Sequence, residues 1–178
     1  MLLDQHDDLR TPRLALIAIT PAMLASEKSA DQKLGALIGC AVPQNWPPVD
    51  WEPHVLDILL KQYERCPEQI SWHRYVALVN QDGTRSLIGM TGAFWRETSP
   101  EECEIGYSIL PPHERQGLAT EAAQALIQLI RRSPQVKSVI AHTFPELTGS
   151  IRVMEKCGLV FDGKGEEERT IRYRLWLG

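Results

Sequence analysis

The stretch of the sequence with the most chemical potential is EIGYSILPPHERQGLATEAA, residues 104–123. A strand-like segment ends there at two prolines, a short loop follows, and Gly117 precedes a helical pattern. A strand-turn-helix of this kind directs the free backbone N–H groups from Gln116 to Thr120 at one spot, where the helix dipole adds positive charge. The pattern predicts an anion site, and a phosphate fits it best. The alternative is an ordinary β-α turn that uses glycine for its geometry.

Two familiar nucleotide-binding motifs do not match this loop. No Gly-Lys-Ser/Thr follows Gly117, which excludes a Walker loop, and the second glycine of a dinucleotide fingerprint is absent. Gly117 lets the backbone approach a phosphate closely, and Ala119 is small enough not to obstruct it.

The elements that must position this loop follow from hydrophobic periodicity and turn signals. The helix after Gly117 is the clearest, because Ala119, Ala122, Leu126 and Ile130 recur on one face. Further helices are expected over residues 21–37, 52–64 and 150–157. Strands are expected over residues 13–19, 74–79, 86–95, 104–110, 136–142, 159–161 and 170–176. This order predicts an α/β (α+β) fold, a mixed sheet with helices on its faces.

The bulk properties describe one globular domain spanning residues 1–178. A net charge of −4 without a run of Lys and Arg argues against nucleic acid as a partner. The start of the chain lacks the pattern of a signal peptide, and no apolar stretch is long enough for a membrane span. The four cysteines are scattered and have no metal-ligand spacing. We therefore expect a cytoplasmic protein without membrane or metal partners.

Four segments in the order of the chain resemble the GNAT superfamily of N-acetyltransferases, in particular the branch of the ribosomal-protein N-terminal acetyltransferases. Glu114–Ala119 resembles the pyrophosphate motif of the family, and Ala119-Thr120-Glu121-Ala122 is typical of that branch. The other matching segments are Thr11–Leu14, Glu104–Tyr107 and Ser150–Leu159.

The resemblance implies a GNAT fold, with a mixed, mostly antiparallel sheet of about seven strands flanked by about four helices. Acetyl-CoA would insert where the fourth and fifth strands splay apart, with its pantetheine arm along Tyr107 to Leu110. The implied cofactor-binding residues are Ile109, Leu110, Arg115, Gln116, Gly117, Leu118, Ala119, Thr120 and Ser150.

Three positions depart from the pattern of the family. Glu114 stands where Arg or Gln is usual, Leu147 where many members have Asn, and Met154 where many have the Tyr that acts as general acid. Glu114 would be unfavourable beside a pyrophosphate unless its side chain points outward. Because such loops bind mainly through main-chain N–H groups, we expect weakened rather than abolished cofactor binding.

Acetyl transfer to an amine needs a base, a polarised thioester carbonyl and a protonated thiolate leaving group. The resemblance makes Glu104 the candidate base, with Glu97 as a second choice, although Glu104 could equally be an exposed strand carboxylate. Backbone N–H groups near Ile109 and Leu110 could form an oxyanion hole. Ser150 could act as general acid, bind the pantetheine arm or cap its helix. Tyr107 is expected to pack into the sheet.

Other polar and aromatic side chains carry a weaker signal. Trp46 and Trp51 lie in a Pro-rich loop, where they could form an acceptor wall or belong to the core. The remaining candidates, His54, His73, His113 and His142, have no spacing typical of a metal site or a catalytic triad.

The sequence thus predicts direct transfer of an acetyl group from acetyl-CoA to a primary amine, in a ternary complex. The acceptor could be a protein N-terminus or a small molecule, such as a polyamine, an amino acid or an aminoglycoside-like drug. The three departures leave open a degenerate acyl-CoA-binding or regulatory module without turnover, and a nucleotide-binding protein is a further alternative. Edge strands in this fold permit a homodimer.

Overall fold

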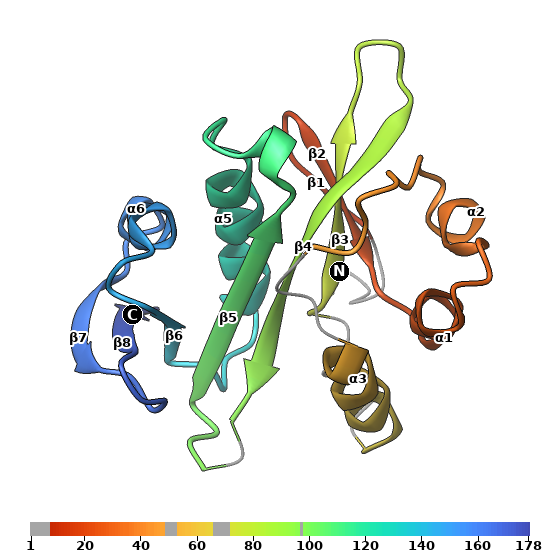
Figure 1. Cartoon of the computed structure of the whole chain (residues 1–178). Helices are drawn as coiled ribbons and strands as arrows, with labels where there is room; N and C mark the ends of the chain where they lie inside the picture. Colours follow the sequence, from red (N-terminus) through yellow and green to blue (C-terminus); the bar gives the residue numbers. More distant parts are fainter. Residues whose placement is uncertain (1–7, 49–52, 66–71, 97) are drawn as a thin grey trace.

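The computed structural model describes residues 8–48, 53–65, 72–96 and 98–178. Its core is one eight-stranded sheet in the order β1-β2-β3-β4-β5-β6-β8-β7 (Figure 1). Only β5 and β6 pair in parallel; all other neighbours are antiparallel. The strands are β1 Leu9–Arg10, β2 Leu14–Ala18, β3 Arg74–Val79, β4 Arg85–Trp95, β5 Glu102–Ile109, β6 Ser138–Thr143, β7 Val160–Lys164 and β8 Ile171–Trp176.

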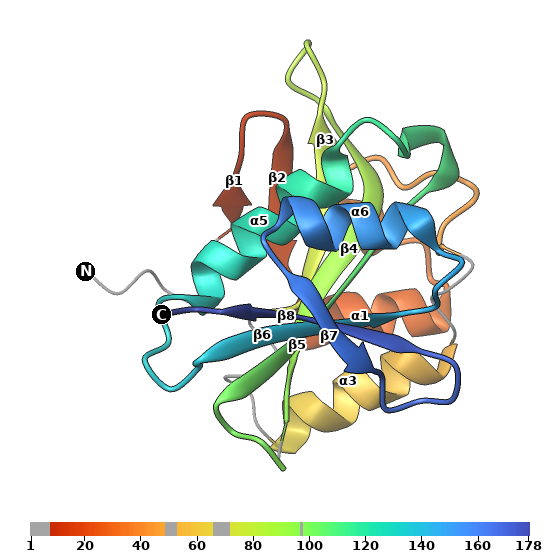
Figure 2. The ribbon, with the colours of Figure 1, turned by 90° about the vertical axis from the view of Figure 1, so that its left-hand side faces the viewer.

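Helices cover both faces of this sheet, which confirms the predicted fold class (Figures 1 and 2). On one face, α1, α2 and α3 bury leucines against β2, β3 and β4, with Leu24 and Leu59 fully buried. On the other face, α5 packs against β2, β4 and β5, and α6 packs against α5 and β6. The helices are α1 Pro21–Ser29, α2 Leu34–Ile38, α3 Pro53–Arg65, the short 3₁₀ helix η1 Pro111–His113, α5 Leu118–Ile130 and α6 Thr148–Lys156.

The single helix predicted over residues 21–37 is wrong, because the chain breaks there into α1 and α2. Thr20 accepts a hydrogen bond from the Met23 N–H and so caps the start of α1. Ala30 and Gln32 then adopt left-handed backbone conformations, with φ of 52° and 61°. Neither residue is a glycine, the usual sequence signal for the end of a helix, so the sequence did not indicate the break.

The sheet opens between β5 and β6. Over the residues that the structure describes, their parallel ladder has three pairs, Glu102 with Ser138, Cys103 with Val139 and Glu104 with Ile140. β5 then continues to Ile109 beside β4 alone. The splay predicted between the fourth and fifth strands therefore begins directly after Glu104.

Candidate active site

The predicted phosphate loop forms a turn that leads into the N-terminus of α5. Gly117 has a φ of 77°, in the left-handed region, and stands at the N-cap of α5. The side chain of Leu118 is buried beneath it at 2% exposure, so this residue can offer a ligand only its backbone. Glu114, Arg115 and Gln116 are exposed. The exposure of Glu114 means that its carboxylate can turn toward solvent.

Arg13, at the turn between β1 and β2, brings a guanidinium group to this loop. Its Nη1 donates to the carbonyl of Gln116 (2.8 Å), and its Nε pairs with Glu121 on the first turn of α5 (2.7 Å). A Cβ added at Gly117 would lie 3.6 Å from Nη2 of Arg13. The loop therefore has a cation beside it that sequence reasoning missed, because about a hundred residues separate Arg13 from the loop.

The open edge of β5 is a row of backbone polar groups. Leu110 donates its N–H to the carbonyl of Ile88 on β4 (2.8 Å), so this N–H is already used. Because hydrogen-bonded and non-bonded pairs alternate in an antiparallel ladder, the N–H of Ile109 points the other way, toward the opening. The prediction that the N–H of Leu110 contributes to an oxyanion hole is therefore wrong. The N–H of Ile109 remains available to a ligand in the opening.

On the far side of the opening, α6 presents Ser150. The hydroxyl of Tyr107 on β5 donates to the carbonyl of Ser150 (2.9 Å) and lies 3.2 Å from its hydroxyl. Burial raises the pKa of Tyr107 to about 12. α6 begins at Thr148 with Leu147 at its N-cap, so the suggestion that Ser150 caps the helix is wrong. Tyr107, expected only to pack, bridges the two elements.

Glu104 lies where the ladder ends, and two basic side chains hold it. Nδ1 of His142 on β6 is 2.7 Å from Oε1 of Glu104, and Nη1 of Arg96 is 3.3 Å from Oε2. The Glu104 side chain keeps 33% of its surface exposed, so a ligand can reach it. His142 is mostly buried and carried no sequence signal, because only the β5–β6 register brings it to Glu104. Glu97, the second choice, lies outside the described residues.

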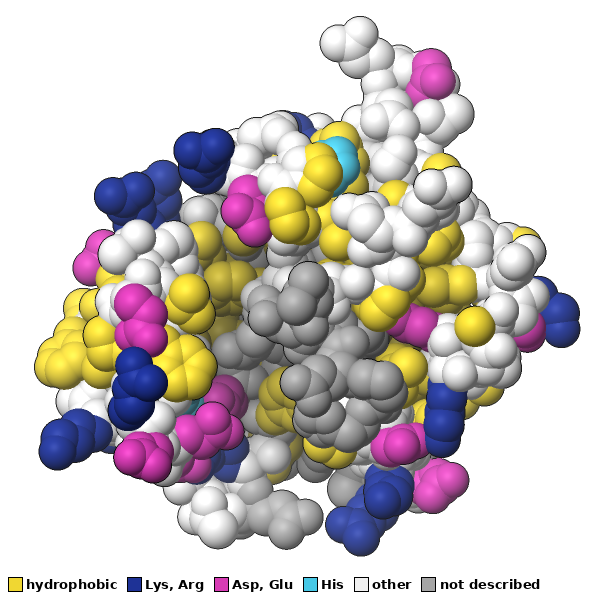
Figure 3. Space-filling view, viewed as in Figure 1, with side chains coloured by type: hydrophobic (Ala, Val, Ile, Leu, Met, Phe, Trp, Pro, Cys, Tyr) yellow, Lys and Arg dark blue, Asp and Glu magenta, His cyan; other side chains and the backbone are white. Residues whose placement is uncertain are grey.

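A network of ion pairs supports this carboxylate from the side of β7 and β8. Arg96 also pairs with Glu166 in the β7–β8 loop, and Arg174 on β8 pairs with Glu102 and Asp162. Charged side chains of both signs gather over this part of the molecule in Figure 3. Glu104 is therefore held by partners that are themselves fixed.

Comparison with known proteins agrees with this geometry. The family model of the acetyltransferase (GNAT) domain matches residues 29–160. The chain belongs to the GNAT family of acetyltransferases. It is 27% identical over 172 residues to the uncharacterized N-acetyltransferase YjdG of Bacillus subtilis, covering 95% of this chain and 96% of that protein.

Solved structures share the fold at low sequence identity. A GNAT-family acetyltransferase from Bacillus anthracis superposes with a TM-score of 0.63 at 18% identity, over 96% of this chain and 99% of that one. RimL, a ribosomal L7/L12 alpha-N-protein acetyltransferase in complex with coenzyme A, gives a TM-score of 0.63 at 14% identity, over 96% and 98%.

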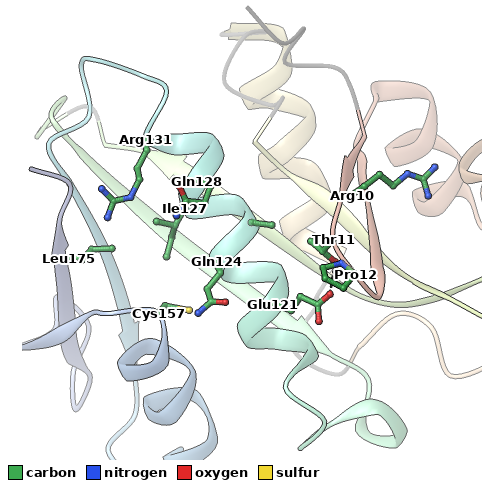
Figure 4. A pocket seen from close by; sticks show the side chains of 11 residues that line it. Arg10, Thr11, Pro12, Glu121, Gln124, Ile127, Gln128, Arg131, Cys157 and Leu175 are labelled. Atoms are coloured by element: carbon green, nitrogen blue, oxygen red, sulfur yellow. Dashed lines mark hydrogen bonds between the residues drawn. The ribbon is translucent and has the colours of Figure 1, made fainter.

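Two hollows lie near this GNAT site. The smaller, of about 260 Å³, lies against β4 and β5 and is lined by Val55, His73, Met90, Thr91, Gly92, Phe94, Gly106, Tyr107 and Ser108. The larger, of about 460 Å³, lies between the β1–β2 turn, α5 and β8 (Figure 4). None of the residues to which the sequence assigned a role lines the larger one. The smaller one borders the strand that carries Glu104.

Two remaining predictions concern aromatic and metal-binding side chains. Trp46 donates to Glu27 (2.9 Å) and packs edge-on against Tyr75, at 5.9 Å between ring centroids, so it belongs to the core beneath α1. Trp51 lies outside the described residues. Among the described residues, no cluster of His, Cys, Asp or Glu is placed to hold a metal ion, and no helix is both long and apolar enough for a membrane span.

Proposed function

We propose that this GNAT enzyme transfers the acetyl group of acetyl-CoA to a primary amine by direct attack in a ternary complex. The observation that carries the proposal is the opening of the sheet directly after Glu104, with the N-terminus of α5 near one end. In this proposal, one strand and the turn that follows it carry the proton acceptor, a row of main-chain hydrogen-bonding groups and the anion site.

Each part of the opening suits one part of the cofactor. The free N–H groups at the start of α5, with the guanidinium of Arg13 beside them, suit a pyrophosphate. The outward-facing backbone groups of β5 suit the amides of a pantetheine arm. Ser150 lies across the opening, at the side chain of Tyr107.

Glu104 takes the role of general base. An amine arrives largely protonated at neutral pH, so it must lose a proton before its nitrogen can attack the thioester carbonyl. Glu104 can receive that proton directly or through a water molecule, while His142 and Arg96 keep its carboxylate in place. A backbone N–H of β5 that faces the opening can donate to the carbonyl oxygen as negative charge develops on it.

The leaving thiolate needs a proton or a hydrogen bond. Met154 is buried in the core and has no proton to donate. Tyr107 stays protonated at neutral pH because burial raises its pKa to about 12. Its hydroxyl already donates to the carbonyl of Ser150, so the hydroxyl of Ser150, 3.2 Å from it, is the candidate donor to the thiolate.

Calorimetry with acetyl-CoA, and with ATP and NAD as controls, tests the cofactor. We expect selective binding of acetyl-CoA, followed by steady release of CoA when primary amines are added. Binding without turnover on a broad amine panel would support a module that binds acyl-CoA and catalyses nothing. Tighter binding of ATP would contradict the proposal.

A further inference from the structure

The smaller hollow lies at Gly106 on β5, whereas the space at its partner Gly92 on β4 is filled by the ring of His73. Gly92 pairs with Gly106, so neither strand projects a side chain from that position. A Cβ added at Gly106 would meet no atom of the described residues within 4 Å, so among these residues the position faces open space. The hollow, about 260 Å³, is therefore a gap in the covering of the sheet face.

The walls of the hollow are apolar apart from a few uncharged polar groups. Val55, Met90 and Phe94 contribute the apolar surface. Among its described lining residues, none is an Asp, Glu, Lys or Arg. A charged group placed here would lose its hydration without gaining a partner of opposite charge from these residues.

His73 supplies a polar group that has no partner. Its side chain is buried at 3% exposure, and Nε2 makes no hydrogen bond with the described residues. The ring packs edge-on against Phe94 at 4.7 Å and lies over Gly92, where an added Cβ would be only 2.1 Å from Nδ1. Burial lowers the pKa of His73 to about 4, so the ring is neutral at physiological pH.

The hollow lies one step along the strand from the proposed base. Glu104 and Gly106 are two residues apart on β5 and so point to the same face, at a spacing of about 7 Å. Phe94, which pairs with Glu104 across the ladder, is also part of the hollow. An amine at Glu104 would therefore place its neighbouring substituent at Gly106.

We propose that this hollow binds the substituent next to the reacting amine, and that it selects small, uncharged substituents over charged ones. The substituent would be the side chain of an N-terminal residue or of an amino acid. This inference rests on the proposed acetyl transfer, and it disfavours polyamines and aminoglycosides as acceptors.

A panel of amino acid amides tests the inference, since they share one amine and differ in the substituent. Acetylation of glycinamide, alaninamide, valinamide, lysinamide and aspartic acid α-amide is followed at saturating acetyl-CoA. For the wild type we expect kcat/KM for alaninamide and valinamide to exceed that for the two charged amides by about tenfold or more. Equal or better use of the charged amides would overturn the inference.

Gly106→Ala and Gly106→Val place side chains of increasing volume in the hollow. We expect Gly106→Val to lower kcat/KM for valinamide about tenfold more than for glycinamide, with Gly106→Ala between it and the wild type. Val160→Leu, which enlarges an exposed side chain on β7, is the matched control and should leave the ratio unchanged. An equal loss for all amides would overturn the inference.

Two further measurements separate the possible failures. Circular dichroism and the acetyl-CoA dissociation constant show whether each variant is folded and binds its cofactor; the wild-type panel decides the question if Gly106→Val does not fold. Turnover without the expected order of amides would overturn this inference and leave the acetyl transfer standing. No turnover of any amide, with turnover of a polyamine, would overturn this inference alone, whereas no turnover of any primary amine would overturn the proposed function as well.

Discussion

Glu104 illustrates how the neighbours of a residue define its chemistry. A carboxylate on a half-exposed strand is an ordinary feature, but this one has a histidine on one oxygen and an arginine on the other. Both partners limit its rotation, which favours a fixed distance to the reacting amine. The sequence predicted Glu104 as a candidate base but did not predict its contact with His142, because this contact depends on a parallel strand register that no local pattern encodes.

For Glu104→Gln we expect kcat to fall about 100-fold, because the amide cannot accept the proton. The pH profile of kcat/KM should lose the limb that depends on this carboxylate, while acetyl-CoA binding stays unchanged. His142→Phe should cost less, about tenfold, since it only frees Glu104 to move. Steady-state kinetics across pH gives both numbers, and wild-type turnover of Glu104→Gln would remove this residue from the mechanism.

His73 predicts a pH dependence of stability. Burial lowers its pKa from 6.5 to about 4, so between these values the unfolded chain binds a proton that the folded chain does not. The free energy of unfolding should therefore fall as the pH drops through this window, by up to about 3 kcal/mol from this residue. Urea denaturation of the wild type and of His73→Phe at both ends of the window measures the difference. Equal losses in the two proteins would contradict it.

At the scale of elements, the start of α5 shows what local sequence patterns can predict. Gly117, the buried face of the helix and the prolines before it predicted the strand, turn and helix correctly, because all of these signals are contiguous in the chain. The contact with Arg13 and the bridge from Tyr107 to Ser150 were not predictable in this way, since each joins distant segments. The break between α1 and α2 also escaped, because it uses non-glycine residues in left-handed conformations.

Gly117→Glu should raise the acetyl-CoA dissociation constant about 100-fold, by adding a negative charge and a side chain at the proposed pyrophosphate position. Any side chain is strained at this φ, at a cost of about 1–2 kcal/mol. Gly117→Ala therefore serves as the control for strain, and we expect it to weaken binding by less than tenfold. Calorimetry measures the acetyl-CoA dissociation constant of both variants, and circular dichroism checks that they are folded. Unchanged affinity in Gly117→Glu would mean that the site lies elsewhere.

Tyr107→Phe should remove the hydrogen bond that joins β5 to α6. The loss of its hydrogen bond to the carbonyl of Ser150 should lower the free energy of unfolding by about 1 kcal/mol. Tyr63→Phe, which removes a hydroxyl on α3 across the sheet, is the control, with an expected change of at most about 0.5 kcal/mol. Urea denaturation measures both. A Tyr107→Phe protein as stable as the wild type would show that this bridge does not stabilise the fold.

At the scale of the whole molecule, the order of elements was predictable and the position of the opening followed from the family resemblance. The two-residue strand β1 was missed, since two residues show no alternation. The homodimer stays a prediction; β7, at one edge of the sheet, exposes Val160 and Phe161. The proposed selection of the acceptor depends on a hollow at Gly106, and the pairing of Gly106 with Gly92 became visible only with the strand register.

Binding in the opening should stabilise the entire domain, because the ligand would contact β5, α5 and α6 together. At a hundred times its dissociation constant, acetyl-CoA should contribute about 2.7 kcal/mol to the free energy of unfolding, raising Tm by about 5–10 °C. Differential scanning fluorimetry measures the shift, with ATP and NAD at the same concentrations as controls. Equal shifts with all three compounds would argue against a selective site.

The parted ladder has a further consequence for how the protein behaves in the test tube. Beyond Glu104, β5 pairs with β4 only, so its other side is an unpaired edge although β5 lies in the middle of the sheet. The backbone N–H and C=O groups on that side can pair with a peptide segment of another molecule. Unpaired strand edges of this kind promote aggregation of partly unfolded chains. Ligand-free stocks should therefore lose material to precipitation faster than stocks kept with acetyl-CoA, so that the cofactor also protects solubility.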